Sequence, residues 1–169
     1  MKLTPLEPED LELLYTIENN PELWSVGSTN VPYSRYALRD YIATQQHDIY
    51  ADRQVRLVAR VSADGEAEKA VGLVDMYNFS PTHQRAEIGF AILREEQGKG
   101  YGRQALQHLE EYARSVLHLH TLYAVVSAGN RASLATLRSS GFSHEHRLPD
   151  WIKSSDGSWE DAILLQKTL

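Results

Sequence analysis

The chain of 169 residues is predicted to form one α/β (α+β) domain. We expect a mixed, mostly antiparallel sheet of about seven strands, flanked by about four helices. The periodicity of the apolar residues indicates this class, because it is helical near the start, alternates as in a strand after about Arg53, and mixes both patterns toward the end. The length also fits a single core, so residues 1–169 are expected to fold as one unit.

The early part of the chain predicts a short strand over residues 2–6 and then two helices. The first helix is expected to begin at Pro8, because proline is favoured at the first helical position, and to end before Asn20-Pro21. Residues 24–33 are rich in turn-forming types and predict a loop. Ser34 is expected to cap the second helix.

The strands and helices after about residue 53 are predicted from runs of apolar residues and from apolar residues at helical spacing. Strands are predicted over residues 55–61, 71–77, 86–93 and 122–127, and a final hairpin over 144–151 and 159–166. A long helix is predicted from about Tyr101, because seven apolar residues form one stripe. These are Ala105, Leu106, Leu109, Tyr112, Ala113, Val116 and Leu117. A shorter helix is predicted over residues 130–140.

Composition excludes several classes of function. The formal net charge is -6 and the basic residues are scattered, which argues against nucleic acid as the main partner. The absence of cysteine excludes disulfides, thiolate metal sites and a cysteine nucleophile. The histidine pairs have no further ligand pattern, so no metal is expected. No stretch predicts a signal peptide or a membrane span, which favours a cytoplasmic protein with no membrane partner; a homodimer is compatible with the sequence.

The most informative segment runs from Glu95 to Arg103, where glycine stands at every second position, 98, 100 and 102. Glycines before a helix let the backbone approach a bulky anion, and free N–H groups at the helix start suit a diphosphate. A dinucleotide fingerprint would need glycine where Arg103 stands, and a nucleoside-triphosphate loop would need Ser or Thr where Gly100 stands. A simple glycine-rich turn remains the alternative.

Gln97–Gly102 resembles the Gln/Arg-x-x-Gly-x-Gly/Ala loop of the GNAT (GCN-five-related) N-acetyltransferases. The preceding strand, and the later Asn130 and Gly141-Phe142, occur in the order and spacing of that family, so the resemblance covers nearly the whole chain. The run from Gly72 through His120 is similar to the spermidine/diamine branch, whereas Asn130–Ser133 is similar to the branch that acetylates ribosomal-protein N-termini.

The resemblance implies that acetyl-coenzyme A is the co-substrate and that an amine attacks it directly in a ternary complex. It implies that six backbone amides bind the diphosphate, those of Gln97, Gly98, Lys99, Gly100, Tyr101 and Gly102. The strand containing Ile88, Phe90 and Ile92 would pair its main chain with the pantetheine arm. Asn130 would hydrogen-bond the same arm, and it is also read as a helix cap.

The resemblance makes Glu87 the first choice for the general base, with Asp75 and His83 as second choices. A carboxylate on a central strand is costly unless it faces a cleft or a partner. Many family members place a tyrosine proton donor where this chain has Leu137. Ser133 is one helical turn nearer the helix start, and it or a water that it holds is the preferred donor. Alternatively, the thiolate leaves without a donor.

The resemblance also places one wall of the acceptor cleft in residues 27–33 and the helix that follows. The polyamine branch is acidic there, but this chain has Ser-Thr-Asn-Val-Pro at 28–32. The candidate acceptor residues are Trp24, Tyr33, Asp75 and Tyr77. The favoured acceptor is a small molecule of the polyamine or diamine type. The alternatives are a protein N-terminus of the ribosomal-protein type, and a non-catalytic acyl-coenzyme A binder.

Overall fold

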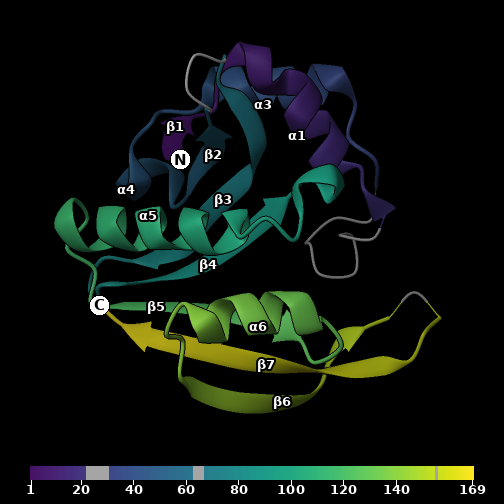
Figure 1. Cartoon of the computed structure of the whole chain (residues 1–169), viewed down its shortest axis with the longest axis vertical. Helices are drawn as coiled ribbons and strands as arrows, with labels where there is room; N and C mark the ends of the chain where they lie inside the picture. The colour runs from purple at the N-terminus through teal and green to yellow at the C-terminus, as the bar shows by residue number, and fades with distance from the viewer. Residues whose placement is uncertain (22–30, 63–66, 155) are drawn as a thin grey trace.

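The computed structural model describes residues 1–21, 31–62, 67–154 and 156–169. In these residues seven strands form one sheet in the order β1-β2-β3-β4-β5-β7-β6 (Figure 1). The strands are β1 (Lys2–Pro5), β2 (Val55–Val61), β3 (Lys69–Ser80), β4 (Arg85–Ile92), β5 (Thr121–Ser127), β6 (His144–Lys153) and β7 (Trp159–Thr168). All neighbours are antiparallel except β4 and β5, which are parallel. The predicted mixed, mostly antiparallel sheet is confirmed.

Five α-helices and two 3-10 turns lie within the described ranges. The helices are α1 (Leu11–Glu18), α3 (Arg35–Thr44), α4 (Ile49–Asp52), α5 (Tyr101–Ser115) and α6 (Arg131–Ser139), and the 3-10 turns are η1 (Pro8–Asp10) and η2 (Arg94–Glu96). The expectation of about four helices missed α4, which is a single turn. The helix expected from Pro8 is divided into η1 and α1.

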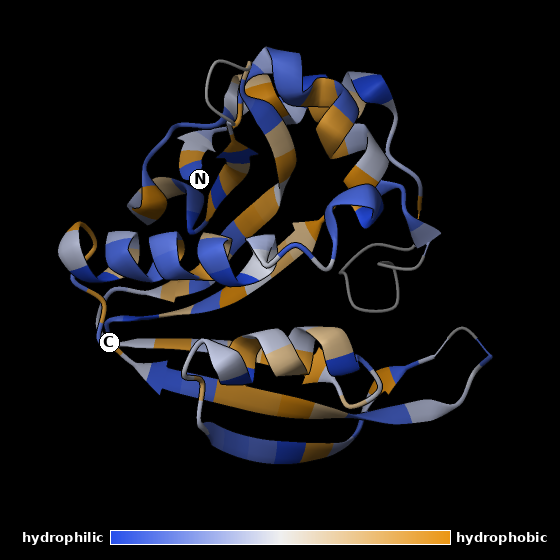
Figure 2. Ribbon diagram, viewed as in Figure 1, coloured by the Kyte–Doolittle hydropathy of each residue, from blue (hydrophilic) through white to orange (hydrophobic). Residues whose placement is uncertain are grey.

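Helices cover both faces of the sheet. Successive strand residues point to opposite faces, so neighbouring residues of one strand pack against different helices. On β2, Val58 packs with Leu14 of α1 and Leu38 of α3. The next residue, Ala59, belongs to the larger core with Leu106 of α5 and the apolar face of α6. Figure 2 shows hydrophobic residues along β3, β5 and β7, whereas the edge strand β6 is mostly hydrophilic.

Local signals in the sequence explain most element ends. Ser34 caps α3 as predicted, because its Oγ accepts the N–H of Ala37 at 3.1 Å. Val116 was wrongly assigned to the buried stripe of the long helix. That helix ends at Ser115, and Val116 is 58% exposed. Most of the predicted loop at 24–33, including Trp24, lies outside the described residues.

Candidate active site

The glycine loop lies between the turn η2 and the helix α5. Gly98 and Gly100 have φ of +77° and +79°, the left-handed region that favours glycine, and Gly100 is the N-cap of α5. Apart from the adjoining residues of the chain, no described atom lies within 4 Å of where a Cβ would stand at either position. The first α5 hydrogen bond described runs from the Gln104 N–H to the Gly100 carbonyl at 3.2 Å, so the amides just before Gln104 are outside the helical ladder. This open cradle of amides fits a diphosphate.

Glu96 connects the glycine loop to β3 through two lysines. The carboxylate is 4% exposed and accepts hydrogen bonds from Lys69 of β3 and, at 2.9 Å, from Lys99 of the loop. The Lys69 bond first, and then the Lys99 bond, keep the pKa of Glu96 below its usual value. The Gln97 side chain donates to the Ile92 carbonyl at 3.0 Å. The loop is therefore tied to both β3 and β4.

Strands β4 and β5 part directly after a short paired stretch. They pair only through Arg85, Ala86 and Glu87 of β4, opposite residues 121–123 of β5. Residues 88–92 still pair with β3 on one side, but their main-chain groups on the β5 side have no strand partner in the described chain. Figure 1 shows the two strands diverging toward the N-terminal ends of α5 and α6. An unpaired stretch of strand can hydrogen-bond an extended amide-containing arm.

The predicted residues of α6 lie at the same opening. The Asn130 Oδ1 accepts the Ser133 N–H at 3.1 Å, which confirms the helix-cap interpretation of Asn130. The Ser133 hydroxyl makes no hydrogen bond to another described residue, and the side chain is half-buried. Leu137 is completely buried in the core. Position 137 therefore packs inward and presents no side chain at the opening.

Glu87 points to the face of β4 opposite Ala86 and Ile88, which are buried under α5. The carboxylate accepts a hydrogen bond from Asn78 at 2.8 Å and a longer one from the Tyr77 hydroxyl at 3.4 Å. In strand register Glu87 lies between Tyr77 of β3 and Tyr123 of β5.

The two tyrosines remain hydrogen-bond donors. Burial raises the pKa of both Tyr77 and Tyr123, and the charge of Glu87 raises each further. Glu87 is therefore surrounded by neutral hydrogen-bond donors.

Asp75, a second choice for the base, is in a different environment. Both of its oxygens accept from the Arg56 guanidinium, at 2.8 and 3.0 Å. Arg56 also donates to Glu18 at 2.5 Å. Asp75 and Glu18 therefore share one arginine through charge-assisted hydrogen bonds, and both Asp75 oxygens are occupied by it.

Two other predicted residues, Tyr33 and His83, are exposed. Tyr33 is 37% exposed, and its main chain is fixed by the Asn19 side chain through bonds of 2.7 and 3.0 Å. His83 lies in the exposed turn between β3 and β4.

The described residues contain no group of three or more His, Cys, Asp or Glu that could hold a metal. No helix in the described ranges is long and apolar enough to cross a membrane.

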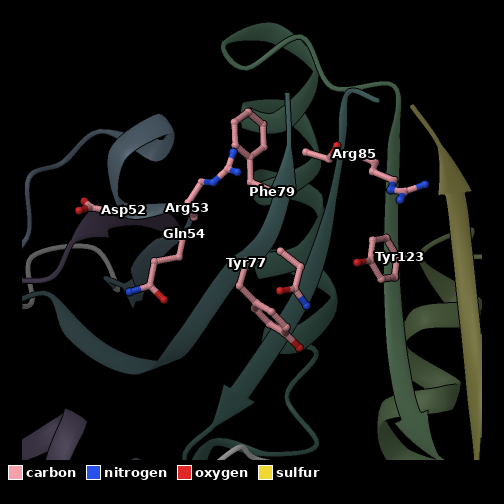
Figure 3. Close-up of a pocket in the computed structure, with 9 residues that line it drawn as sticks. Asp52, Arg53, Gln54, Tyr77, Phe79, Arg85 and Tyr123 are labelled. Atoms are coloured by element: carbon pink, nitrogen blue, oxygen red, sulfur yellow. The ribbon is translucent and has the colours of Figure 1, made fainter. Parts of the chain in front are cut away.

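A pocket of about 540 Å³ is lined in part by Tyr77 and Asn78, the two side chains that donate hydrogen bonds to Glu87 (Figure 3). Its lining residues come from the segment before β2, the end of β3, and the starts of β4 and β5; they are Asp52, Arg53, Gln54, Tyr77, Asn78, Phe79, Ser80, Arg85 and Tyr123. A neighbouring pocket of about 400 Å³ shares Arg85 and Tyr123. Sequence reasoning missed these two residues. The one available signal was that Arg85 alternates with Glu87 on β4, but Tyr123 reaches the site only through strand pairing.

Comparison with known proteins agrees with this geometry. Residues 1–143 match the family model of the Acetyltransferase (GNAT) domain. The chain is 34% identical over 149 residues to spermidine N(1)-acetyltransferase of Escherichia coli (strain K12), covering 88% of this chain and 75% of that protein. It is 31% identical over 151 residues to YdaF of Bacillus subtilis (strain 168), which is named provisionally as a ribosomal N-acetyltransferase; the match covers 87% and 80% of the two chains.

A solved structure of spermidine N-acetyltransferase from Vibrio cholerae, in complex with CoA and spermine, matches with a TM-score of 0.84 at 25% identity. The match covers 99% of this chain and 94% of that one. The chain therefore belongs to the GNAT acetyltransferase family. It is an N-acetyltransferase that uses acetyl-coenzyme A and transfers the acetyl group to an amine. The resemblance seen in the sequence, including both branches, is confirmed.

Proposed function

We propose that this enzyme acetylates the primary amine of a small molecule by direct attack in a ternary complex, with Glu87 as the general base. The observation that carries the proposal is the position of Glu87, on the last residue pair before β4 and β5 part. The acetyl donor supplies the reactive thioester. The amides of Gln97–Gly102 bind its diphosphate, and the unpaired edge of residues 88–92 binds the arm that leads to the sulfur.

The residues of the chain then manage the protons and the charge. A primary amine with a pKa of about 10 is protonated at neutral pH and has to lose a proton before it can attack. Glu87 accepts that proton directly or through water, because its partners Asn78 and Tyr77 are neutral. A main-chain N–H near Ile88–Phe90 stabilises the developing oxyanion. Ser133, or a water that it holds, donates a proton to the departing thiolate.

The acceptor class is best approached with a panel of amines. Spermidine and diamines come first, because the Escherichia coli and Vibrio cholerae relatives are named for spermidine acetylation. Peptides that carry a free N-terminus form the second group, because the resemblance to YdaF extends over most of the chain. Within the described face, however, the nearby carboxylates of Glu18 and Asp75 are already bonded to Arg56.

The test is the release of coenzyme A thiol from acetyl-coenzyme A with this panel, for the wild type and for Glu87→Gln. We expect Glu87→Gln to lower kcat by roughly a hundredfold to ten-thousandfold, the usual contribution of general-base catalysis, with an unchanged Kd for acetyl-coenzyme A. Glu111→Gln removes an exposed carboxylate on α5 and serves as the matched control. Turnover unaffected by Glu87→Gln would overturn the role of Glu87. Acetyl-coenzyme A binding without turnover of any amine would favour a non-catalytic binder.

A further inference from the structure

A pair of opposite charges on β4 is left unmatched beside the pocket. Arg85 and Glu87 are two residues apart and therefore lie on the same face, with Cα atoms roughly 7 Å apart. They do not form an ion pair with each other, because Glu87 is turned toward Asn78 and Tyr77 of β3. Arg85 is exposed and has no ion-pair partner among the described residues.

The surroundings of Arg85 are polar and lack a compensating carboxylate. Arg85 and Tyr123 line both the larger and the smaller pocket, and Figure 3 shows the two side chains near each other on β4 and β5. Arg53, on the opposite side of the larger pocket, also has no ion-pair partner in the described chain. Asp52 is the one carboxylate in the lining, but it accepts the Gln46 N–H at 3.2 Å, and its side chain points away from the pocket in Figure 3.

Two arginines without an ion-pair partner in the described chain, Arg53 and Arg85, therefore line the pocket. Two other lining residues, Tyr77 and Asn78, donate hydrogen bonds to Glu87. A guanidinium group binds a carboxylate or a phosphate through charge-assisted hydrogen bonds. A simple polyamine has no group for Arg85, whereas an acceptor with an amine and a nearby anion satisfies both charges.

We infer that the acceptor is an amine that carries an anionic group, a carboxylate or a phosphate, which binds at Arg85 while the amine faces Glu87. This inference rests on the proposed function and narrows its acceptor class. Arg85 selects the substrate and has no part in the proton transfer. Arg53 strengthens the positive potential at the far side of the pocket.

The experiment compares matched amines in steady-state acetylation. β-Alanine is paired with propylamine, and phosphoethanolamine with ethanolamine, so that the two pairs separate carboxylate from phosphate recognition; spermidine is measured in parallel. We expect wild-type kcat/KM to favour an anionic member at least tenfold. Arg85→Gln should reduce that preference by roughly ten- to a hundredfold, mainly through KM, because a hydrogen bond to a charged group is lost. The rate with the uncharged partner should fall much less than the rate with the anionic one, because the uncharged amine has no group that Arg85 binds.

Two further variants separate this role from a structural one. Arg85→Lys keeps the charge and should retain part of the preference. Arg114→Gln, at the far end of α5, should behave like the wild type. Equal rates within both pairs, or a preference that survives Arg85→Gln, would overturn the inference. Turnover of spermidine without turnover of either anionic amine would also overturn it but would support the proposed function, whereas failure with every amine would count against the proposed function itself.

Discussion

Two carboxylates of this protein, Asp75 and Glu87, have different hydrogen-bond partners. Asp75 and Glu87 both point to the acceptor face, but the oxygens of Asp75 are bonded to a guanidinium and those of Glu87 to an amide and a phenol. A carboxylate paired with a cation is a weaker proton acceptor than one held by neutral donors. The sequence ranks Glu87 first by resemblance. It does not reveal that Arg56, 19 residues before Asp75, binds both of the Asp75 oxygens.

Ser133→Ala tests the proton donor without disturbing the helix. The cap of α6 uses the Ser133 N–H and the Asn130 side chain, so loss of the hydroxyl leaves the cap intact. We expect kcat to fall at least tenfold, with an unchanged free energy of unfolding, because a donor to the thiolate is lost. Steady-state thiol release and urea unfolding provide the two measurements. An unaltered kcat would mean that the thiolate leaves unaided. Asn130→Ala is the contrast, because it removes the cap and should destabilise the protein by about 1 kcal/mol.

Among helices and strands, those with a regular apolar pattern were predictable from the sequence. Short turns and contacts between distant segments were not. The alternation of β2 gave its limits correctly, and the glycine spacing indicated the turn before α5. The single turn α4 is too short to show a period. The attachment of Glu96 to Lys69 was not predictable either, because the two residues are 27 positions apart and meet only when β3 and β4 pair. The pocket was missed for the same reason.

Gly100→Ala tests the conformation of the loop. The Gly100 φ of +79° is strained for a residue with a Cβ, so we expect a loss of about 1–2 kcal/mol in the free energy of unfolding and weaker binding of acetyl-coenzyme A. Gly102→Ala is the matched control. A Cβ there would meet Phe90 at 3.4 Å and Thr136 at 3.5 Å, which are ordinary contacts, and alanine is the better helix former. Urea unfolding and calorimetry should separate the two variants; similar effects of both would contradict the assignment.

The pH dependence of stability tests the attachment of Glu96. The pKa of Glu96 is lowered in the folded state, so the folded protein binds fewer protons than the unfolded chain at acidic pH. Its contribution is therefore complete above the ordinary glutamate pKa of about 4.3 and is lost as the pH falls through the lower folded value. We expect Glu96→Gln to lower Tm at neutral pH, and the difference from wild type to shrink in acid. Glu95→Gln, at the exposed neighbouring position, should show no such trend. A pH-independent difference would refute the explanation.

Across the whole molecule, the sheet consists of two parts joined by few strand contacts. Strands β1–β4 and strands β5–β7 meet through three residue pairs, and the opening beyond them is the proposed cofactor groove. Side chains on the opposite face add to this joint. Lys167 of β7 donates to Glu110 of α5 at 2.6 Å and to the Ser140 carbonyl, after α6, at 2.7 Å. One lysine therefore links both helices to the second part of the sheet.

The link from Lys167 to Glu110 is expected to matter through charge burial. The side chains are 21% and 10% exposed, and the second Glu110 oxygen is buried with no hydrogen-bond partner in the described chain. Lys167→Met leaves the Glu110 charge unpaired and should cost about 2–3 kcal/mol, less than for a fully buried pair because water reaches Lys167. The double variant Glu110→Leu with Lys167→Met replaces both charges by apolar groups and should lie within about 1 kcal/mol of the wild type. Urea unfolding of the wild type, both single variants and the double variant measures the coupling directly. Additive losses would show that the two side chains act independently. If the two losses are coupled, and if the double variant also binds acetyl-coenzyme A more weakly, the Lys167–Glu110 pair would be shown to set the width of the groove between β4 and β5.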